Sequence, residues 1–241
     1  MKSLINLSIM ALLLFSLCMG QTSTSALKTS VTLEVGTTHT FEFHDNGEYV
    51  GYNTYTVTKK EMYNEREAYF IESVVDLTTD ELTLHMDASY IVDTLGRCLH
   101  YEFSGTINGE PHTMNADFAE GTVHITASTP GEEFDKTITI AQNTFTLDNN
   151  MICQWDITFS TVVLEKEGIF AVYMFAAQPM KTAYIRASIS SESVSVQTAG
   201  RTWECLKLEF STPADYTMYV TQDGQLVKME NESGLVVTLK E

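Results

Sequence analysis

The chain is short of basic residues. Its 241 residues include 14 Lys and Arg against 32 Asp and Glu, which gives a formal net charge of −18 at pH 7. A surface with this excess of negative charge repels the phosphates of nucleic acids and the headgroups of anionic lipids. We therefore expect no nucleic acid partner, although the acidity by itself names no ligand.

Long apolar segments are missing after residue 26. A transmembrane helix needs about 20 predominantly apolar residues, and no later stretch approaches that length. The long apolar run near the start, Leu4 to Leu17, follows Lys2 and precedes small and polar residues, which is typical of a secretory signal peptide. We predict that residues 1–26 are a signal peptide and leader. The protein is then exported to the periplasm or the extracellular space and has no transmembrane helix.

Cysteine is scarce as well. Cys18 lies in the predicted signal region, where cleavage after Gly20 or Ala26 competes with attachment of a lipid anchor to Cys18. The other cysteines are Cys98, Cys153 and Cys205. An oxidising compartment allows one disulfide among these three and leaves one thiol over, and the pairing stays open. Because no CxxC motif occurs, neither a redox motif nor a structural zinc motif is predicted.

Motifs of known catalytic chemistry are absent from the sequence. It contains no nucleophile elbow, no HExxH zinc motif, no phosphate-binding glycine loop and no EF-hand loop. We therefore predict no catalytic residue and no cofactor, and we expect the protein not to be an enzyme.

What the chain does contain is a succession of short strand patterns joined by tight turns. Asn46 and Gly47 form the centre of a two-residue hairpin turn, which predicts that Phe43 lies opposite Val50 and Phe41 opposite Tyr52. Asp223 and Gly224 predict a second hairpin near the end of the chain. Its expected partners are Val220 with Val227 and Met218 with Met229.

Three turns set the register of the segment from Arg97 to Ile140. They are centred on Asn108 and Gly109, on Glu120 and Gly121, and on Pro130 and Gly131. The expected cross-strand partners are Phe103 with Met114, Tyr101 with Ala116, Leu99 with Phe118, Phe118 with Val123, Ala116 with Ile125, Ala127 with Phe134, and Val123 with Ile138. Since a one-residue slip would move every side chain to the other face, the agreement of three turns predicts a four-strand meander with one apolar face.

The polar face of this meander carries a transverse row of His100, Asp117 and His124. Two imidazoles and a carboxylate are ligands that zinc accepts. Side chains directly opposite one another across two strand spacings seldom converge on one ion. We therefore interpret the row as surface charge and predict no metal site.

One stretch, Asp148 to Gly168, departs from the strand pattern. Apolar residues recur there at helical spacing. They are Met151, Ile152, Trp155, Phe159, Val162 and Val163. We predict a helix near 148–166, capped by Asp148 and stopped by Gly168. The β-branched residues from Ile157 to Val163 also suit a strand, which is the alternative.

These patterns together predict an all-β fold with one helix. We expect residues 27–241 to form a single β-rich domain, because no linker rich in Pro, Gly or Ser interrupts them. The expected architecture is a large curved antiparallel sheet, a half-barrel or a sandwich, of about a dozen strands. The helix packs on its concave face.

The concave face is the candidate ligand site. Its apolar residues are ones that adapt to an acyl chain or another apolar molecule. The residues assigned to it are Leu99, Tyr101, Phe103, Met114, Phe118, Trp155 and Phe159. The alternative is that they form an ordinary core. A helix that fills the concavity makes a core, whereas one that fills it only in part leaves a pocket.

A resemblance to a known family adds to this interpretation. It is carried by the secretion signal, the meander, the helix after Leu147 and Asp148, the strand from Ile169 to Pro179, and the closing runs WECLKLEF and MYVTQDGQLVKMEN. These features resemble uncharacterised bacterial envelope proteins with a DUF3108-like domain of unknown function, which are distantly similar to the LolA and LolB lipoprotein carriers. The resemblance covers most of the mature chain. It implies a curved sheet around a helix and a location in the cell envelope, and it brings no catalytic residues.

Two functions follow as expectations. The first is a non-enzymatic extracytoplasmic protein of the cell envelope that binds a lipid or another apolar ligand in its curved sheet. The second is a structural or interaction module of the cell surface whose apolar faces are all core and whose partner is another envelope protein or a glycan.

Overall fold

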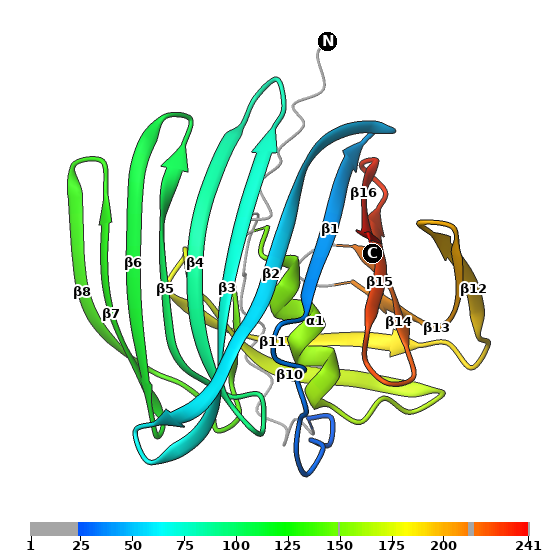
Figure 1. Ribbon diagram of the computed structural model, residues 1–241, viewed down its shortest axis with the longest axis horizontal. Helices are drawn as coiled ribbons and strands as arrows, with labels where there is room; N and C mark the ends of the chain where they lie inside the picture. Colours follow the sequence, from blue (N-terminus) through cyan, green and yellow to red (C-terminus); the bar gives the residue numbers. More distant parts are fainter. Residues whose placement is uncertain (1–23, 149, 212–214, 241) are drawn as a thin grey trace.

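The computed structural model describes residues 24–148, 150–211 and 215–240. Residues 1–23 of the predicted signal peptide, with Cys18 and Gly20, lie outside the described residues. The described residues form one helix, α1 (Ile152–Thr161), and sixteen strands (Figure 1). The strands are β1 (Thr38–Asp45), β2 (Glu48–Tyr63), β3 (Arg66–Thr78), β4 (Thr83–Asp93), β5 (Cys98–Ile107), β6 (Glu110–Ala119), β7 (Thr122–Thr129), β8 (Glu132–Thr139), β9 (Phe145–Leu147), β10 (Gly168–Ala176), β11 (Lys181–Ile189), β12 (Val194–Thr198), β13 (Arg201–Phe210), β14 (Tyr216–Thr221), β15 (Leu226–Asn231) and β16 (Leu235–Lys240). The predicted all-β fold with one helix is confirmed.

All of these strands belong to one open curved sheet. Its order is β8-β7-β6-β5-β4-β3-β2-β1-β16-β15-β14-β13-β11-β10-β9, and β12 pairs with β13 beside this path. The sheet has more strands than the dozen expected. It is also mixed, because β9 runs parallel to β10, with Phe145 opposite Met174. The sequence gives no turn signal for this pairing, since the two strands are joined through α1 and not through a hairpin.

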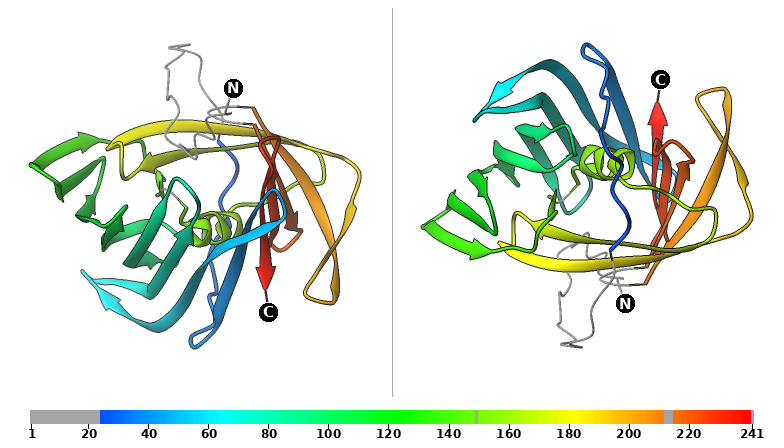
Figure 2. Two further views of the ribbon diagram at one scale, coloured as in Figure 1. Left: turned by 90° about the horizontal axis from the view of Figure 1, so that it is seen from above. Right: turned by 90° about the horizontal axis from the view of Figure 1, so that it is seen from below.

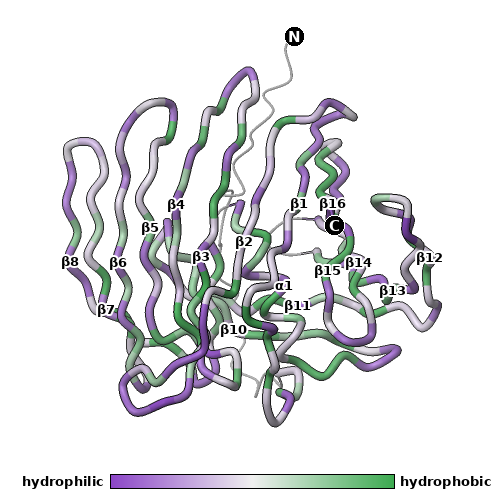
Figure 3. Tube along the Cα trace, viewed as in Figure 1, coloured by the Kyte–Doolittle hydropathy of each residue, from purple (hydrophilic) through white to green (hydrophobic). Residues whose placement is uncertain are grey.

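The sheet curves around the helix. In Figure 2, α1 lies between β1 to β4 on one side and β10 and β11 on the other. Phe118 of β6 and Phe175 of β10 meet edge to face, with ring centroids 5.7 Å apart. Figure 3 shows apolar residues concentrated around the helix and hydrophilic residues at the end of the β2–β3 hairpin. The concave side therefore forms the core.

The predicted register of the β5 to β8 meander is confirmed except for the pair of Leu99 with Phe118, because the pairing of β5 with β6 begins at His100. The observed partners are Phe103 with Met114, Tyr101 with Ala116, Phe118 with Val123, Ala116 with Ile125, Ala127 with Phe134, and Val123 with Ile138. His100 lies opposite Asp117, and Asp117 lies opposite His124, as expected. The β5–β6 turn has Asn108 and Gly109 at positive φ, which is the backbone that a two-residue hairpin turn requires.

The first hairpin has the predicted turn but not the predicted register. His44 lies opposite Tyr49, whereas Phe43 lies opposite Gly51 because a β-bulge at Val50 inserts one residue. Gly51 has a φ of 144°, and a Cβ there would come within 1.9 Å of the carbonyl oxygen of Asp76. The close approach of β3 therefore requires glycine at this position.

A second bulge displaces part of the β14–β15 hairpin. Met218 lies opposite Met229 as predicted, but Val220 lies opposite Leu226 and not Val227. The extra residue turns Val227 to the other face of the sheet, where it packs with Val196 and Cys205.

The helix is shorter than predicted at its start. Its N-cap position is held by Met151, and no side chain caps it. Asp148 is therefore not the cap. Its carboxylate accepts a hydrogen bond from the hydroxyl of Tyr101 on β5, so the residue links the segment before the helix to the meander.

The helix also ends earlier, at Thr161 and not near residue 166. Ile157, Thr158 and Thr161 are helical, as predicted, whereas Val162 is extended and forms a β-bridge with Leu27. The ammonium group of Lys28 donates to the carbonyl oxygen of Ser160 at 2.9 Å. A positive charge at a helix C-terminus complements the carbonyl groups left without intrahelical partners.

The helix is buried on all sides and not along one face. Nine of its ten residues are buried. The polar ones among them are Gln154, Asp156, Thr158 and Thr161. Burial of an ionised carboxylate costs several kcal/mol unless donors surround it.

Four donors surround Asp156. The hydroxyl of Tyr55 lies 2.7 Å away, the backbone N–H of Leu226 2.7 Å, the side-chain amide of Gln225 2.8 Å and Nδ1 of His39 3.2 Å. Burial, followed by the charge of Asp156, raises the pKa of Tyr55 well above its ordinary value, so the phenol stays protonated and donates. These contacts join α1 to Tyr55 of β2, to His39 of β1 and to the start of β15.

Replacement of Trp155 by Ala tests the position of the helix. Trp155 is 8% exposed and stacks on Phe159, with ring centroids 5.7 Å apart. We expect Trp155→Ala to lower the free energy of unfolding by about 3–5 kcal/mol, because it leaves a cavity in the core. Urea denaturation measures this change. Tyr49→Ala, which removes an aromatic side chain that is 57% exposed, is the control and should change stability by less than about 1 kcal/mol. Equal stability of the two variants would contradict the observed packing.

Candidate functional site

The seven residues predicted to line a ligand site do not lie together in the structure. Tyr101 is fully buried, and its hydroxyl donates to Asp148. Burial, followed by the negative charge of Asp148, raises the pKa of Tyr101 well above its ordinary value. Phe103 and Met114 are 6% and 5% exposed and face each other across β5 and β6. These three residues belong to the core.

Trp155 and Phe159 are also core residues, but they contact a different part of the sheet. Trp155 packs edge to face on Phe210, with ring centroids 5.4 Å apart, and Phe159 contacts Phe170 at 5.1 Å. The helix therefore turns its aromatic rings towards β10 and β13. No ring contact joins them to Phe103 among the described residues.

Leu99 lies on the opposite face from the one predicted. On β4, Ile91 lies opposite His100 and Val92 opposite Cys98, so Leu99 is the extra residue of a bulge. It packs with Ala68 and Ile91 in a small cluster apart from the main core. The bulge interrupts the alternation from which its position was predicted.

The volume between the helix and the strands shows whether the concave face is a packed core or a ligand pocket. A cavity of about 20 Å³ lies there, lined in part by Tyr90, Thr146 and Gln154. Such a volume holds about one water molecule, whereas sites for small ligands occupy about 300 Å³ or more. An acyl chain does not fit into it.

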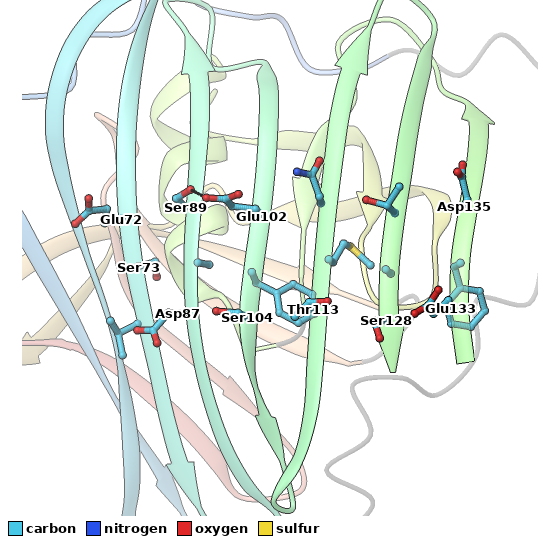
Figure 4. Close-up of a pocket in the computed structure, with 18 residues that line it drawn as sticks. Glu72, Ser73, Asp87, Ser89, Glu102, Ser104, Thr113, Ser128, Glu133 and Asp135 are labelled. Atoms are coloured by element: carbon cyan, nitrogen blue, oxygen red, sulfur yellow. Dashed lines mark hydrogen bonds between the residues drawn. The ribbon is translucent and has the colours of Figure 1, made fainter. Parts of the chain in front are cut away.

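A much larger concavity lies on the face of the sheet that points away from the helix. It has a volume of about 1060 Å³ and is lined by three successive residues from each of the strands β3 to β8 (Figure 4). We call it the outer groove. Its middle row, Ser73, Ala88, Phe103, Met114, Ala127 and Phe134, follows the cross-strand register. Apart from the half-buried Phe134, the side chains of this row are buried on the helix side.

Polar side chains form the two walls of the outer groove. Strand alternation directs the residues on either side of the middle row outward. One wall carries Glu72, Ser89, Glu102, Asn115, Thr126 and Asp135, and the other carries Val74, Asp87, Ser104, Thr113, Ser128 and Glu133. Figure 4 shows the labelled members of these walls as two lines across the strands.

The outer groove is negatively charged. Five carboxylates line it, those of Glu72, Asp87, Glu102, Glu133 and Asp135, and no Lys, Arg or His does. Glu102 accepts a hydrogen bond from Ser89 at 2.9 Å. Among the described residues, Glu72 and Glu133 form no ion pair within 4.0 Å, so both carboxylates are open to a ligand.

The histidine row borders this groove. His100 contacts Asp117, with Nδ1 and Oδ1 2.8 Å apart, whereas His124 contacts Asp135 at 2.9 Å instead of Asp117. The three residues predicted as a row are thus cross-strand neighbours, but they do not share one centre. No cluster of three or more metal-binding side chains occurs in the described parts of the chain. The row consists of two separate contacts, one between His100 and Asp117 and one between His124 and Asp135.

The three described cysteines are not paired. Cys98, Cys153 and Cys205 are all buried as free thiols, so the disulfide that the sequence allowed does not form. Burial raises the pKa of Cys98 to about 12 and that of Cys153 to about 11. Burial also raises the pKa of Cys205 to about 11.

These thiols should be chemically inert in the folded protein. Alkylation requires the thiolate, and a thiol with a raised pKa stays protonated at pH 8. We expect iodoacetamide to leave Cys98, Cys153 and Cys205 unlabelled in the native protein and to label all three in urea, as read by peptide mass spectrometry. Labelling of Cys98 in the native protein at the rate seen in urea would contradict its burial.

Comparison with known proteins gives limited information. Within the described ranges, no helix is long and apolar enough to cross a membrane. No known family profile matches the sequence, and no curated protein matches it. One solved structure, a DUF1089 family protein from Pseudomonas aeruginosa, is similar at 10% identity, with a TM-score of 0.40, over 70% of this chain and 86% of that chain.

Proposed function

We propose that the protein is a non-enzymatic, exported interaction module of the cell envelope, whose outer groove holds an extended basic segment of another envelope protein. One observation carries the proposal. A concavity of about 1060 Å³ crosses six strands and is lined by five carboxylates and no cationic side chain. Complementary charge steers association and selects partners.

The shape of the groove favours an extended ligand. It crosses the six strands β3 to β8, and its volume is at the upper end of the range of about 300–1,000 Å³ that is usual for small-molecule sites. The serine, threonine and asparagine side chains along its walls donate and accept hydrogen bonds. They can satisfy the backbone of a bound polypeptide while the carboxylates pair with its Lys and Arg side chains.

A glycan and a lipid are supported less well. The aromatic residues that line the groove, Phe103 and Phe134, are buried and half-buried, so no exposed ring offers a stacking surface for a sugar. The cavity of about 20 Å³ beside α1 is too small for an acyl chain. The proposed location in the cell envelope rests on the resemblance to DUF3108-like envelope proteins. The proposed ligand does not rest on the similarity to LolA-type carriers.

Binding of a basic peptide tests the proposal. The probe is a fluorescent peptide of alternating lysine and serine, and the readout is fluorescence anisotropy at physiological salt. We expect the double variant Glu72→Gln, Glu133→Gln to weaken binding about 3- to 10-fold, since exposed ion pairs contribute about 0.2–1 kcal/mol each. Higher salt should weaken binding further.

The control removes the same charge elsewhere. Glu165 and Glu167 are exposed and lie outside the groove, so the double variant Glu165→Gln, Glu167→Gln should bind the peptide as tightly as the unchanged protein. Equal weakening in both double variants would mean that net charge and not the groove holds the peptide. Binding of a neutral glycan with no binding of the peptide would replace the proposal by a glycan-binding function.

A further inference from the structure

A second concavity, with a volume of about 410 Å³, lies at the end of the sheet where β3 begins. We call it the end pocket. The lining residues that matter for its chemistry are Arg66, Arg97, Leu99, Phe118, Glu120 and Ile140. It shares no residue with the outer groove, and its volume falls in the range of small-molecule sites.

One part of the end pocket is apolar. Leu99 is 8% exposed and packs against Ala68 and Ile91. Phe118 is half-buried and rests edge to face on Phe175. Ile140, also half-buried, packs against the main core. These side chains form an apolar wall of the pocket.

Two arginines line the same pocket. The chain has four arginines in all, so half of them gather here although the protein is strongly acidic. Arg97 is oriented by the buried Asp93, whose carboxylate it contacts through Nε at 2.8 Å and Nη2 at 2.6 Å. Asp93 also accepts the backbone N–H groups of Leu95 and Arg97, so its position is set.

Arg66 is the free cation of the pair. It is exposed, and within the described ranges it forms no ion pair. The pocket holds one carboxylate, Glu120, which lies more than 4.0 Å from the charged nitrogens of both arginines, since no ion pair joins them. The charge of Arg97 is compensated by its contact with Asp93, so Arg66 supplies the positive charge that is free for a ligand, beside the one carboxylate of Glu120. The acidic groups of the rest of the surface act weakly here, because charges more than about 8 Å apart are screened at physiological salt.

We propose that the end pocket binds a small amphiphilic carboxylate, a medium-chain fatty acid anion by its chemistry. Arg66 contacts the carboxylate, which matches the planar fork of a guanidinium group. Arg97, whose charge is paired with Asp93, borders the same pocket. The chain of the ligand lies against Leu99, Phe118 and Ile140. This inference does not depend on the proposed function of the outer groove.

Calorimetric titration with decanoate below its micelle concentration tests the inference. We expect saturable binding of decanoate to one site, and binding of decanol and decylamine at least about tenfold weaker, because a charge-assisted hydrogen bond is lost. Arg66→Gln should weaken decanoate binding about tenfold or more, and Arg66→Lys should restore part of the affinity. Arg66 is exposed, so the thermal melting of these variants should match that of the unchanged protein.

Arg186→Gln is the matched control. Arg186 lies on β11, is exposed and does not line the pocket, so its loss changes the net charge equally. It should leave decanoate binding unchanged. Equal binding of decanol and decanoate, equal weakening by Arg66→Gln and Arg186→Gln, or no saturable binding of decanoate would each overturn the inference. None of these results bears on the binding of the basic peptide to the outer groove.

Discussion

The buried carboxylate of Asp156 joins α1 to three strands of the sheet. A helix enclosed on all sides cannot leave an ionised group to water, and an unpaired buried carboxylate would cost several kcal/mol. The donors come from β2, from the strand that carries His39 and from the residues that begin β15. These strands are near neighbours in the order β2-β1-β16-β15, so their shared contacts with Asp156 hold this part of the sheet against α1.

This enclosure determines where a ligand can bind. The concave side is filled by the helix and by large side chains from both ends of the sheet, and the space left beside α1 is about 20 Å³. Two concavities lined by described residues, the outer groove and the end pocket, offer more volume. The two differ in charge, since the charged residues that line one are all carboxylates, whereas the other is lined by one glutamate and two arginines, of which Arg97 is paired with Asp93. They are therefore suited to different classes of ligand on one rigid scaffold.

Local rules were sufficient to predict the meander from the sequence. An Asn-Gly turn such as Asn108 and Gly109 requires positive φ at both residues, and this fixes which residues of the flanking strands lie opposite each other. The same arithmetic located the row of His100, Asp117 and His124, which lies next to one wall of the outer groove. The groove itself was missed, because its walls follow the polar alternation that any solvent-facing strand shows. Its signal was the lack of a basic residue along two whole cross-strand rows.

The predictions from sequence were wrong at two kinds of place. One is a strand with an inserted residue, and the other is the helix, where polar residues are buried against the polar–apolar pattern. Helical spacing predicted one apolar face for α1, whereas its polar residues are also buried. Asp156 is bonded by groups of the surrounding strands, and the hydroxyls of Thr158 and Thr161 donate to carbonyl oxygens of the helix itself. Sequence alternation cannot show a bulge, since the inserted residue looks like any other strand residue. The bulge at Leu99 is the most consequential of these. It turns Leu99 away from the main core and into the end pocket beside Arg97. The bulge therefore removes Leu99 from the predicted ligand site and places it in the apolar wall of the end pocket.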